Sequence, residues 1–133
     1  MLALHYEHRH KVLAITVAGV LSSEDLADHD RVVLRFLAGR EGVRGLYDLS
    51  AVDAVAVPVS RINQRGQRPT IIDGVRVMVA PGGSAGLVFI RSMADQLRAA
   101  GHREPLIAET LADAYRLLDL VDPRFEPVDP PVA

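Results

Sequence analysis

A glycine-rich loop carries the residues that are best suited to binding an anion. The loop follows the apolar run 76–80 and precedes a helical pattern, and its members are Gly82, Gly83, Ser84 and Gly86. Backbone amides at the start of a helix bind phosphate or carboxylate without a side-chain charge. The loop matches neither the dinucleotide-binding glycine pattern nor a P-loop, because no Lys-Ser/Thr ending follows it. Two interpretations stay open, an anion site and a turn that caps the helix.

A second group of candidate residues follows the sequence Asp48-Leu49-Ser50. Val55 and Val57 are part of an apolar stretch that Pro58 closes, and such a lip beside a sheet would suit a ligand cleft. The alternative is that these valines are core residues beneath the next helix, because aliphatic side chains near strand ends usually serve packing.

Three arginines, at positions 61, 65 and 68, follow this stretch. Arg61 and Arg65 are four residues apart and therefore share one side of a helix. They suit either a solvated helix face or the binding of an anion or an acidic partner. We include Arg61 with the valines and the glycine loop in a predicted ligand site.

Histidines and serines give no catalytic or metal pattern. His5 and His8 project to opposite faces of an extended strand, so they do not converge with His10 on one ion. His29 is expected on the inward side of its helix as a hydrogen-bonded residue at the edge of the core. No nucleophile elbow surrounds a serine, and the chain has no cysteine. We predict no enzymatic activity, no catalytic residue, no metal and no cofactor.

Composition limits the class of protein. The chain has 133 residues, 49% hydrophobic and 24% charged, which is typical of one globular domain. A net charge of -2 and 5% aromatic residues argue against nucleic-acid binding. No stretch approaches the roughly 20 apolar residues of a membrane span. The run 12–21 superficially resembles a signal peptide, but no cleavage site follows it. We predict a cytoplasmic location.

The order of elements predicts an α/β fold. Alternating apolar residues in 2–7 and 12–18 indicate an antiparallel hairpin, and Ser22 with Asp25 indicates the start of a helix. The central stretch 43–59 is expected to form a strand that ends at Ser50 and turns into a second apolar run.

The second half of the chain repeats a strand and a helix. The expected elements are a short helix after Pro58, a strand at 76–80 buried on both faces, a helix to about Ala100, a strand at 106–108 and a helix from Thr110. Leu111, Ala114, Tyr115 and Leu118 are its expected inner residues. We predict one domain, 1–121, and a proline-rich extended tail, 122–133.

The layout resembles the STAS superfamily, and within it the SpoIIAA-like small bacterial proteins. The resemblance rests on Tyr47-Asp48-Leu49-Ser50 at a strand end and on Val77-Met78-Val79-Ala80-Pro81 before the glycines, and it covers about residues 2–120. It implies a mixed sheet of four or five strands with an N-terminal hairpin, helices mainly on one face, and a regulatory or binding role.

The chain departs from this family where anti-sigma-factor antagonists carry a phosphorylated serine in Asp-Ser-Ser-Gly. It has Ala56-Val57-Pro58-Val59 there, so the kinase-controlled switch does not transfer. We predict a non-catalytic interaction module that contacts a protein partner or itself. The alternative is a carrier or sensor of a small apolar or anionic, lipid-like molecule.

Overall fold

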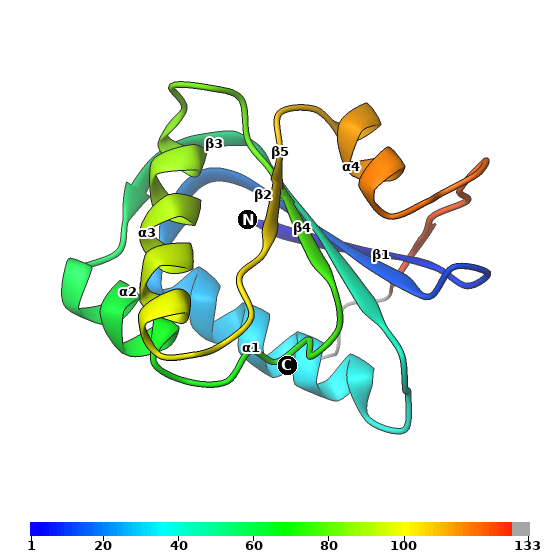
Figure 1. Ribbon diagram of the computed structural model, residues 1–133, viewed down its shortest axis with the longest axis horizontal. Coiled ribbons are helices and arrows are strands. Elements are labelled where there is room, and N and C mark those ends of the chain that lie inside the picture. Colours follow the sequence, from blue (N-terminus) through cyan, green and yellow to red (C-terminus); the bar gives the residue numbers. More distant parts are fainter. Residues whose placement is uncertain (129–133) are drawn as a thin grey trace.

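The chain folds into a mixed six-stranded sheet with helices on both faces, as a computed structural model of residues 1–128 describes it (Figure 1). The sheet order is β5-β4-β3-β2-β1-β6. The elements in chain order are β1 (Leu2–Glu7), β2 (Val12–Ser22), α1 (Ser23–Leu37), β3 (Arg44–Ala56), α2 (Val59–Gly66), β4 (Arg76–Val79), α3 (Ala85–Ala99), β5 (Leu106–Ala108), α4 (Leu111–Leu117) and β6 (Glu126–Pro127).

Strand directions confirm the predicted α/β class. β1 and β2 form the antiparallel hairpin, whereas β2, β3, β4 and β5 run parallel to one another. The sheet exceeds the four or five strands that the resemblance implies, because β6 pairs with β1 through Tyr6 and Glu126. Part of the predicted extended tail therefore belongs to the sheet. Residues 129–133 of that tail lie outside the described residues.

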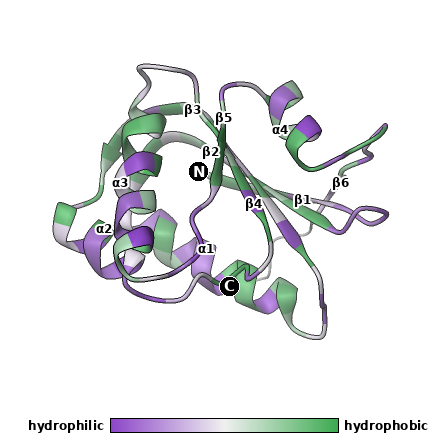
Figure 2. Cartoon of the chain, viewed as in Figure 1, coloured by the Kyte–Doolittle hydropathy of each residue, from purple (hydrophilic) through white to green (hydrophobic). Residues whose placement is uncertain are grey.

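The helices divide unequally between the two faces of the sheet. α1, α2 and α3 cover one face, and α4 covers the other over β4 and β5 (Figure 1). This arrangement agrees with the prediction of helices mainly on one face and is consistent with a SpoIIAA-like α/β fold. In Figure 2 both hydrophobic and hydrophilic colours run along α3, as expected of a helix with one buried side.

Capping residues set the start of α1. The hydroxyl of Ser22 accepts a hydrogen bond from the backbone amide of Asp25 at 3.2 Å, and the Asp25 carboxylate accepts one from the Ser22 amide at 2.9 Å. This reciprocal pair satisfies amides that the first turn leaves without a partner. With the start fixed, His29 and Val33 fall on the buried side of the helix, as predicted.

Two predictions of local structure are wrong. β3 does not end at Ser50 but continues to Ala56, because the long strand β2 pairs with it to Ser22 through two register shifts. The helix α4 buries Ala114 and Leu118, whereas Leu111 is 39% exposed. Leu111 is the first residue of α4, and within this short helix only Ala114 is buried, while Leu118 lies directly after the helix end.

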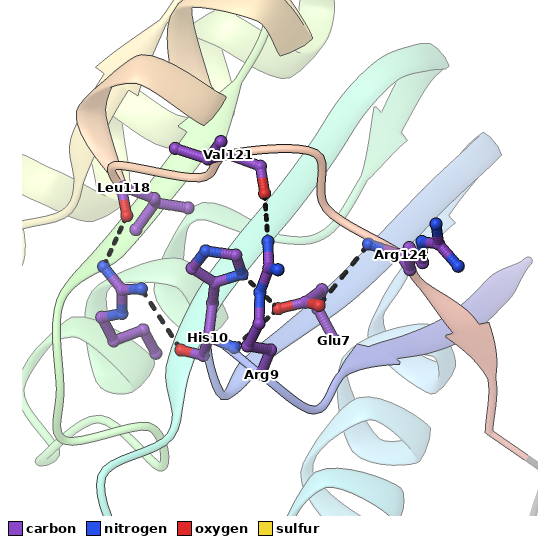
Figure 3. A network of polar contacts seen from close by, with 7 residues as sticks. Glu7, Arg9, His10, Leu118, Val121 and Arg124 are labelled. Atoms are coloured by element: carbon purple, nitrogen blue, oxygen red, sulfur yellow. Dashed lines mark hydrogen bonds and ion pairs between the residues drawn. The ribbon is translucent and has the colours of Figure 1, made fainter.

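A polar network around the buried Glu7 joins the β1–β2 turn to the segment after α4 (Figure 3). The carboxylate of Glu7 accepts a hydrogen bond from the backbone amide of His10 at 2.6 Å and contacts its ring Nδ1 at 2.5 Å. Burial alone would raise the pKa of Glu7, but the hydrogen bonds from His10 outweigh it and lower the pKa. Arg9 donates to the carbonyl of Val121 at 2.5 Å. The network fixes the hairpin turn to the C-terminal segment.

Candidate functional site: a cavity between α1 and α3

A cavity of about 350 Å³ lies on the face of the sheet that α1, α2 and α3 cover. Its floor includes Tyr47 and Leu49 of β3 and Met78 of β4. One wall is the buried side of α3, and the opposite wall is α1. The loop 68–72 after α2 closes a further side. Such a volume is in the range of small-molecule sites in proteins.

Strand and helix periods bring the lining residues together. Alternate residues of a strand share one face, and the parallel register pairs Gly45 with Arg76 and Tyr47 with Met78. These four residues therefore lie side by side on the cavity face, while Leu46 and Val77 point to the core beneath α4. On α3 the buried residues Phe89, Met93 and Leu97 recur at four-residue spacing and form an apolar wall.

A chain of polar side chains crosses the cavity from the sheet to α2. The Nε2 atom of His29 lies 2.7 Å from the Tyr47 hydroxyl, and its Nδ1 atom lies 2.9 Å from the Asp30 carboxylate. Arg65 donates to both carboxylate oxygens of Asp30, at 2.8 and 2.5 Å. This bidentate ion pair joins α1 to α2.

Burial and pairing determine the charges of this chain. Burial lowers the pKa of His29, and burial raises the pKa of Tyr47, so both groups are neutral at pH 7. Burial would raise the pKa of Asp30, but hydrogen bonds from His29 and Arg65 reverse the effect and hold it well below its usual value. Asp30 is therefore ionised and balanced by Arg65, and the four groups together carry no net charge.

Arg76 is a buried lining residue that has no charged partner within residues 1–128, whereas Arg68, which also lines the cavity without an ion pair in that range, is exposed. Only 5% of its surface is exposed, and its Nη2 atom donates to the backbone carbonyl of Arg103 at 2.8 Å. Its Nε atom is buried and has no hydrogen-bond partner among residues 1–128. None of the ion pairs in that range includes Arg76. Burial lowers the pKa of Arg76, but a guanidinium stays protonated in proteins, so the charge remains.

Gly45 provides the room that the arginine side chain occupies. A Cβ atom at this position would lie 3.3 Å from Cγ of Arg76 and 3.0 Å from Cδ1 of Ile72. These distances are tight for carbon contacts, so a larger residue at position 45 would push against the arginine or the loop 68–72. The glycine thus supports the wall of the cavity rather than a turn.

His29 and Tyr47 form a buried hydrogen-bonded pair in the lining. Tyr47 has a raised pKa and His29 a lowered one, so the pair supplies neither an activated nucleophile nor a charged acid at pH 7. Within residues 1–128 no three His, Asp or Glu side chains lie close enough to hold a metal ion. Two of the histidines considered from the sequence contact carboxylates instead, His8 with Glu126 and His10 with Glu7.

None of the seven residues predicted to bind a ligand lines this cavity. Val57 is buried in the main core, and Val55 packs against it. Arg61 is exposed on α2. The two valines are core residues, as one of the two interpretations of them held.

The glycine loop serves the start of α3. The hydroxyl of Ser84 accepts a hydrogen bond from the amide of Leu87 at 3.2 Å and donates to the carbonyl of Pro81 at 2.6 Å. A Cβ atom on Gly86 would lie 2.9 Å from the carbonyl oxygen of Leu49, so this glycine allows α3 to approach β3. Gly82 and Gly83 are exposed. These contacts favour the turn-and-cap interpretation, and the anion site at this loop stays a prediction.

Sequence reasoning missed the cavity because its polar residues come from four separate elements. The available signal was Arg76 itself, a charged residue at the start of a strand that the pattern predicts to be buried on both faces. A buried charge needs a partner, and the sequence supplies no carboxylate beside it in the strand. That mismatch marks Arg76 as a candidate site residue.

No protein-family model, curated protein or solved structure matches the chain. Within residues 1–128 none of the helices has both the length and the apolar character needed to span a membrane.

Proposed function

We propose that this protein binds a small, mainly apolar molecule in the cavity between α1 and α3, as a carrier or a sensor. The observation that carries the proposal is the cavity itself, whose volume of about 350 Å³ is bounded largely by aliphatic, aromatic and thioether side chains. Sites for small organic molecules combine an apolar wall with a few placed polar groups. The cavity has both.

The lining side chains favour an apolar ligand of variable shape. Leu49, Phe89 and Leu97 offer apolar surface, and Met78 and Met93 add thioethers that adapt to irregular outlines. Leu34 also lines the cavity and is 59% exposed, which places the open side near α1. Burial of apolar ligand surface at about 25 cal/mol per Å² supplies the driving force.

The cavity-filling variant Leu26→Trp tests this function. Leu26 is half-buried on α1 and lines the cavity, so an indole there would occupy ligand volume without replacing a core residue. The matched control is Leu117→Trp, at an exposed position of α4 on the other face. Binding is followed by the fluorescence of N-phenyl-1-naphthylamine, a neutral apolar probe. We expect saturable binding by the natural protein and by Leu117→Trp, and about tenfold weaker binding by Leu26→Trp.

Native mass spectrometry of the purified protein adds a second readout. Under the proposal, a fraction of the protein retains a small molecule of its expression host, and organic extraction removes it. Failure of the natural protein both to bind the probe and to retain any small molecule would overturn the proposal.

A protein-interaction module is the second candidate function, and the edge strand β5 favours it. Leu106 and Ile107 of this strand are 45% and 41% exposed, and β5 pairs only with β4 on one side in residues 1–128. Exposed apolar side chains on an open edge are typical of strand-to-strand contacts. The experiment is light scattering coupled to gel filtration on the natural protein and on Ile107→Lys. If the natural protein and Ile107→Lys are both monomers, and neither elutes with a bound partner protein, this candidate is rejected. The STAS-like assignment and the cytoplasmic location stay predictions from the sequence.

A further inference from the structure

We propose that Arg76 forms an anion subsite within the cavity and that the ligand is an apolar monocarboxylic acid whose carboxylate binds this guanidinium. The inference rests on the proposed function, because it names the class of molecule that the same cavity takes. It assigns the polar end of the ligand to β4 and its apolar part to the wall formed by α3.

The first argument is the unsatisfied arginine. The side chain of Arg76 is 95% buried, since 5% of its surface is exposed, and it lines the cavity. One of its nitrogens is hydrogen-bonded, to the carbonyl of Arg103, whereas Nε has no partner in residues 1–128. Buried charges in proteins are paired, and a guanidinium presents five donors in a fork that matches a carboxylate. The guanidinium therefore has donors that no residue in 1–128 accepts from, and a carboxylate in the cavity would accept from this group.

The second argument is the charge of the surrounding groups. Asp30 is neutralised by Arg65, and Asp25 contacts the N-terminal amino group at 3.5 Å. Neither carboxylate is left to balance Arg76. Of the three arginines in the lining, Arg65 is paired with Asp30, Arg68 is exposed to solvent, and Arg76 is buried without a carboxylate, so a single negative charge on the ligand would balance the buried charge.

The size of the cavity limits the rest of the molecule. A water molecule takes about 30 Å³ in the liquid, so a cavity of about 350 Å³ holds roughly ten to twelve groups of that size. An acid with about ten non-hydrogen atoms therefore fits within it. Octanoic acid has this size, and 1-octanol presents the same chain without the charge.

A purely structural role accounts less well for Arg76. A structural arginine would be expected to satisfy most of its donors with carbonyls or carboxylates, as Arg44 does with the carbonyls of Leu118 and His10 at 2.8 and 3.2 Å. Arg76 instead has one such bond, and its buried Nε atom has no partner within residues 1–128. The two arginines therefore differ in how many of their donors are hydrogen-bonded, although both lie on strands of the same sheet.

Isothermal titration at pH 7.5 with octanoic acid and with 1-octanol tests the inference on the natural protein and on Arg76→Leu. The control is Arg61→Gln, which removes an exposed charge of α2 that does not line the cavity. We expect the natural protein and Arg61→Gln to bind the acid at least about tenfold more tightly than the alcohol, because hydrogen bonds to charged groups are the strong ones. Arg76→Leu should lose this preference and keep its affinity for the alcohol.

The outcomes separate this inference from the proposed function. Equal binding of the acid and the alcohol by the natural protein overturns the acid subsite and leaves the apolar site in place. Binding of neither overturns both. Octyl phosphate is the third ligand, and tighter binding of this dianion than of octanoate would overturn the monocarboxylate assignment. If Arg76→Leu does not fold, Arg76→Lys replaces it. This variant keeps the positive charge but lacks the guanidinium fork. A preference for the acid that persists in Arg76→Lys but is several-fold smaller than in the natural protein supports the inference.

Discussion

The Nε2 atom of His29 in α1 lies 2.7 Å from the hydroxyl oxygen of Tyr47 in β3. Both side chains are buried, and their rings are 5.4 Å apart. The hydrogen bond spans 18 positions of the sequence and fixes α1 over the sheet beside the cavity. The stability of the protein and the shape of its candidate site therefore depend on the same contact.

The variant Tyr47→Phe removes this hydrogen bond and keeps the ring. We expect the free energy of unfolding to fall by about 1–3 kcal/mol, because a buried imidazole nitrogen is left without its partner. Urea denaturation measures the change. Tyr115→Phe is the control, since that hydroxyl makes no hydrogen bond within residues 1–128 and its ring stacks on Phe125. A loss as large in Tyr115→Phe would contradict the assigned role of the Tyr47 bond.

His29 should make stability depend on pH in the mildly acidic range. Burial lowers its pKa below the ordinary value of 6.5 in the native state. As the pH falls below about 6.5, the unfolded chain takes up a proton before the native protein does, so stability decreases, by at most about 1.4 kcal/mol per pH unit. The contribution of the neutral His29 to stability is fully present above about pH 6.5. Urea denaturation of the natural protein and of His29→Gln at pH 7.5 and 5.5 measures it. The natural protein should lose more stability than the variant between these two values.

Asp30 should contribute at lower pH. Its pKa is held well below the ordinary value of 3.8, so its contribution is present above about pH 4 and is lost as the pH falls toward the native pKa. The free energy of unfolding of Asp30→Asn should be about 1–2 kcal/mol lower than that of the natural protein at pH 7. This loss is modest because the ion pair with Arg65 is partly exposed. Its acid denaturation should also be less steep. Asp28→Asn, in an exposed pair with Arg31, is the control. Identical acid profiles for the natural protein and Asp30→Asn would refute the prediction.

Gly86 and Gly82 should respond differently to alanine, although both belong to the same loop region. A Cβ atom on Gly86 meets the backbone of Leu49 at 2.9 Å, whereas one on Gly82 has only the Glu109 side chain, at 3.3 Å. We expect Gly86→Ala to cost about 1–3 kcal/mol of stability through displacement of α3, and Gly82→Ala to change it by less than about 0.5 kcal/mol. Thermal unfolding by circular dichroism measures both. Equal effects would show that packing against β3 is not the constraint at Gly86.

Arg76→Leu should leave the ligand-free protein as stable as the natural one or more stable, by up to about 1–3 kcal/mol. An unpaired buried charge costs free energy, and the shorter, apolar leucine removes that cost while the space of the guanidinium joins the cavity. Arg44→Leu should instead destabilise the protein by about 1–2 kcal/mol, since it removes two hydrogen bonds to backbone carbonyls. Urea denaturation compares the two. A large loss of stability in Arg76→Leu would assign this arginine to the fold rather than to a ligand.

Local patterns in the sequence predict most of the elements. Alternation in 2–7 and 12–18 predicts the hairpin, and the reciprocal cap of Ser22 and Asp25 predicts the start of α1. These signals work because hydrogen bonds and side-chain direction within an element depend on residues close in sequence. The end of β3 could not be predicted this way, since it depends on the length of β2, which pairs with it from far along the chain.

The sequence by itself determined the class of fold, the absence of cysteine chemistry and the inward position of His29 on α1. Only the tertiary structure decided where a ligand would bind. The cavity brings together His29, Tyr47, Arg65 and Arg76 from four elements, and their separations depend on strand register and helix packing. The unpaired state of Arg76 is likewise a property of its surroundings, because a charged residue reveals a missing partner only when the neighbours that exclude water are known.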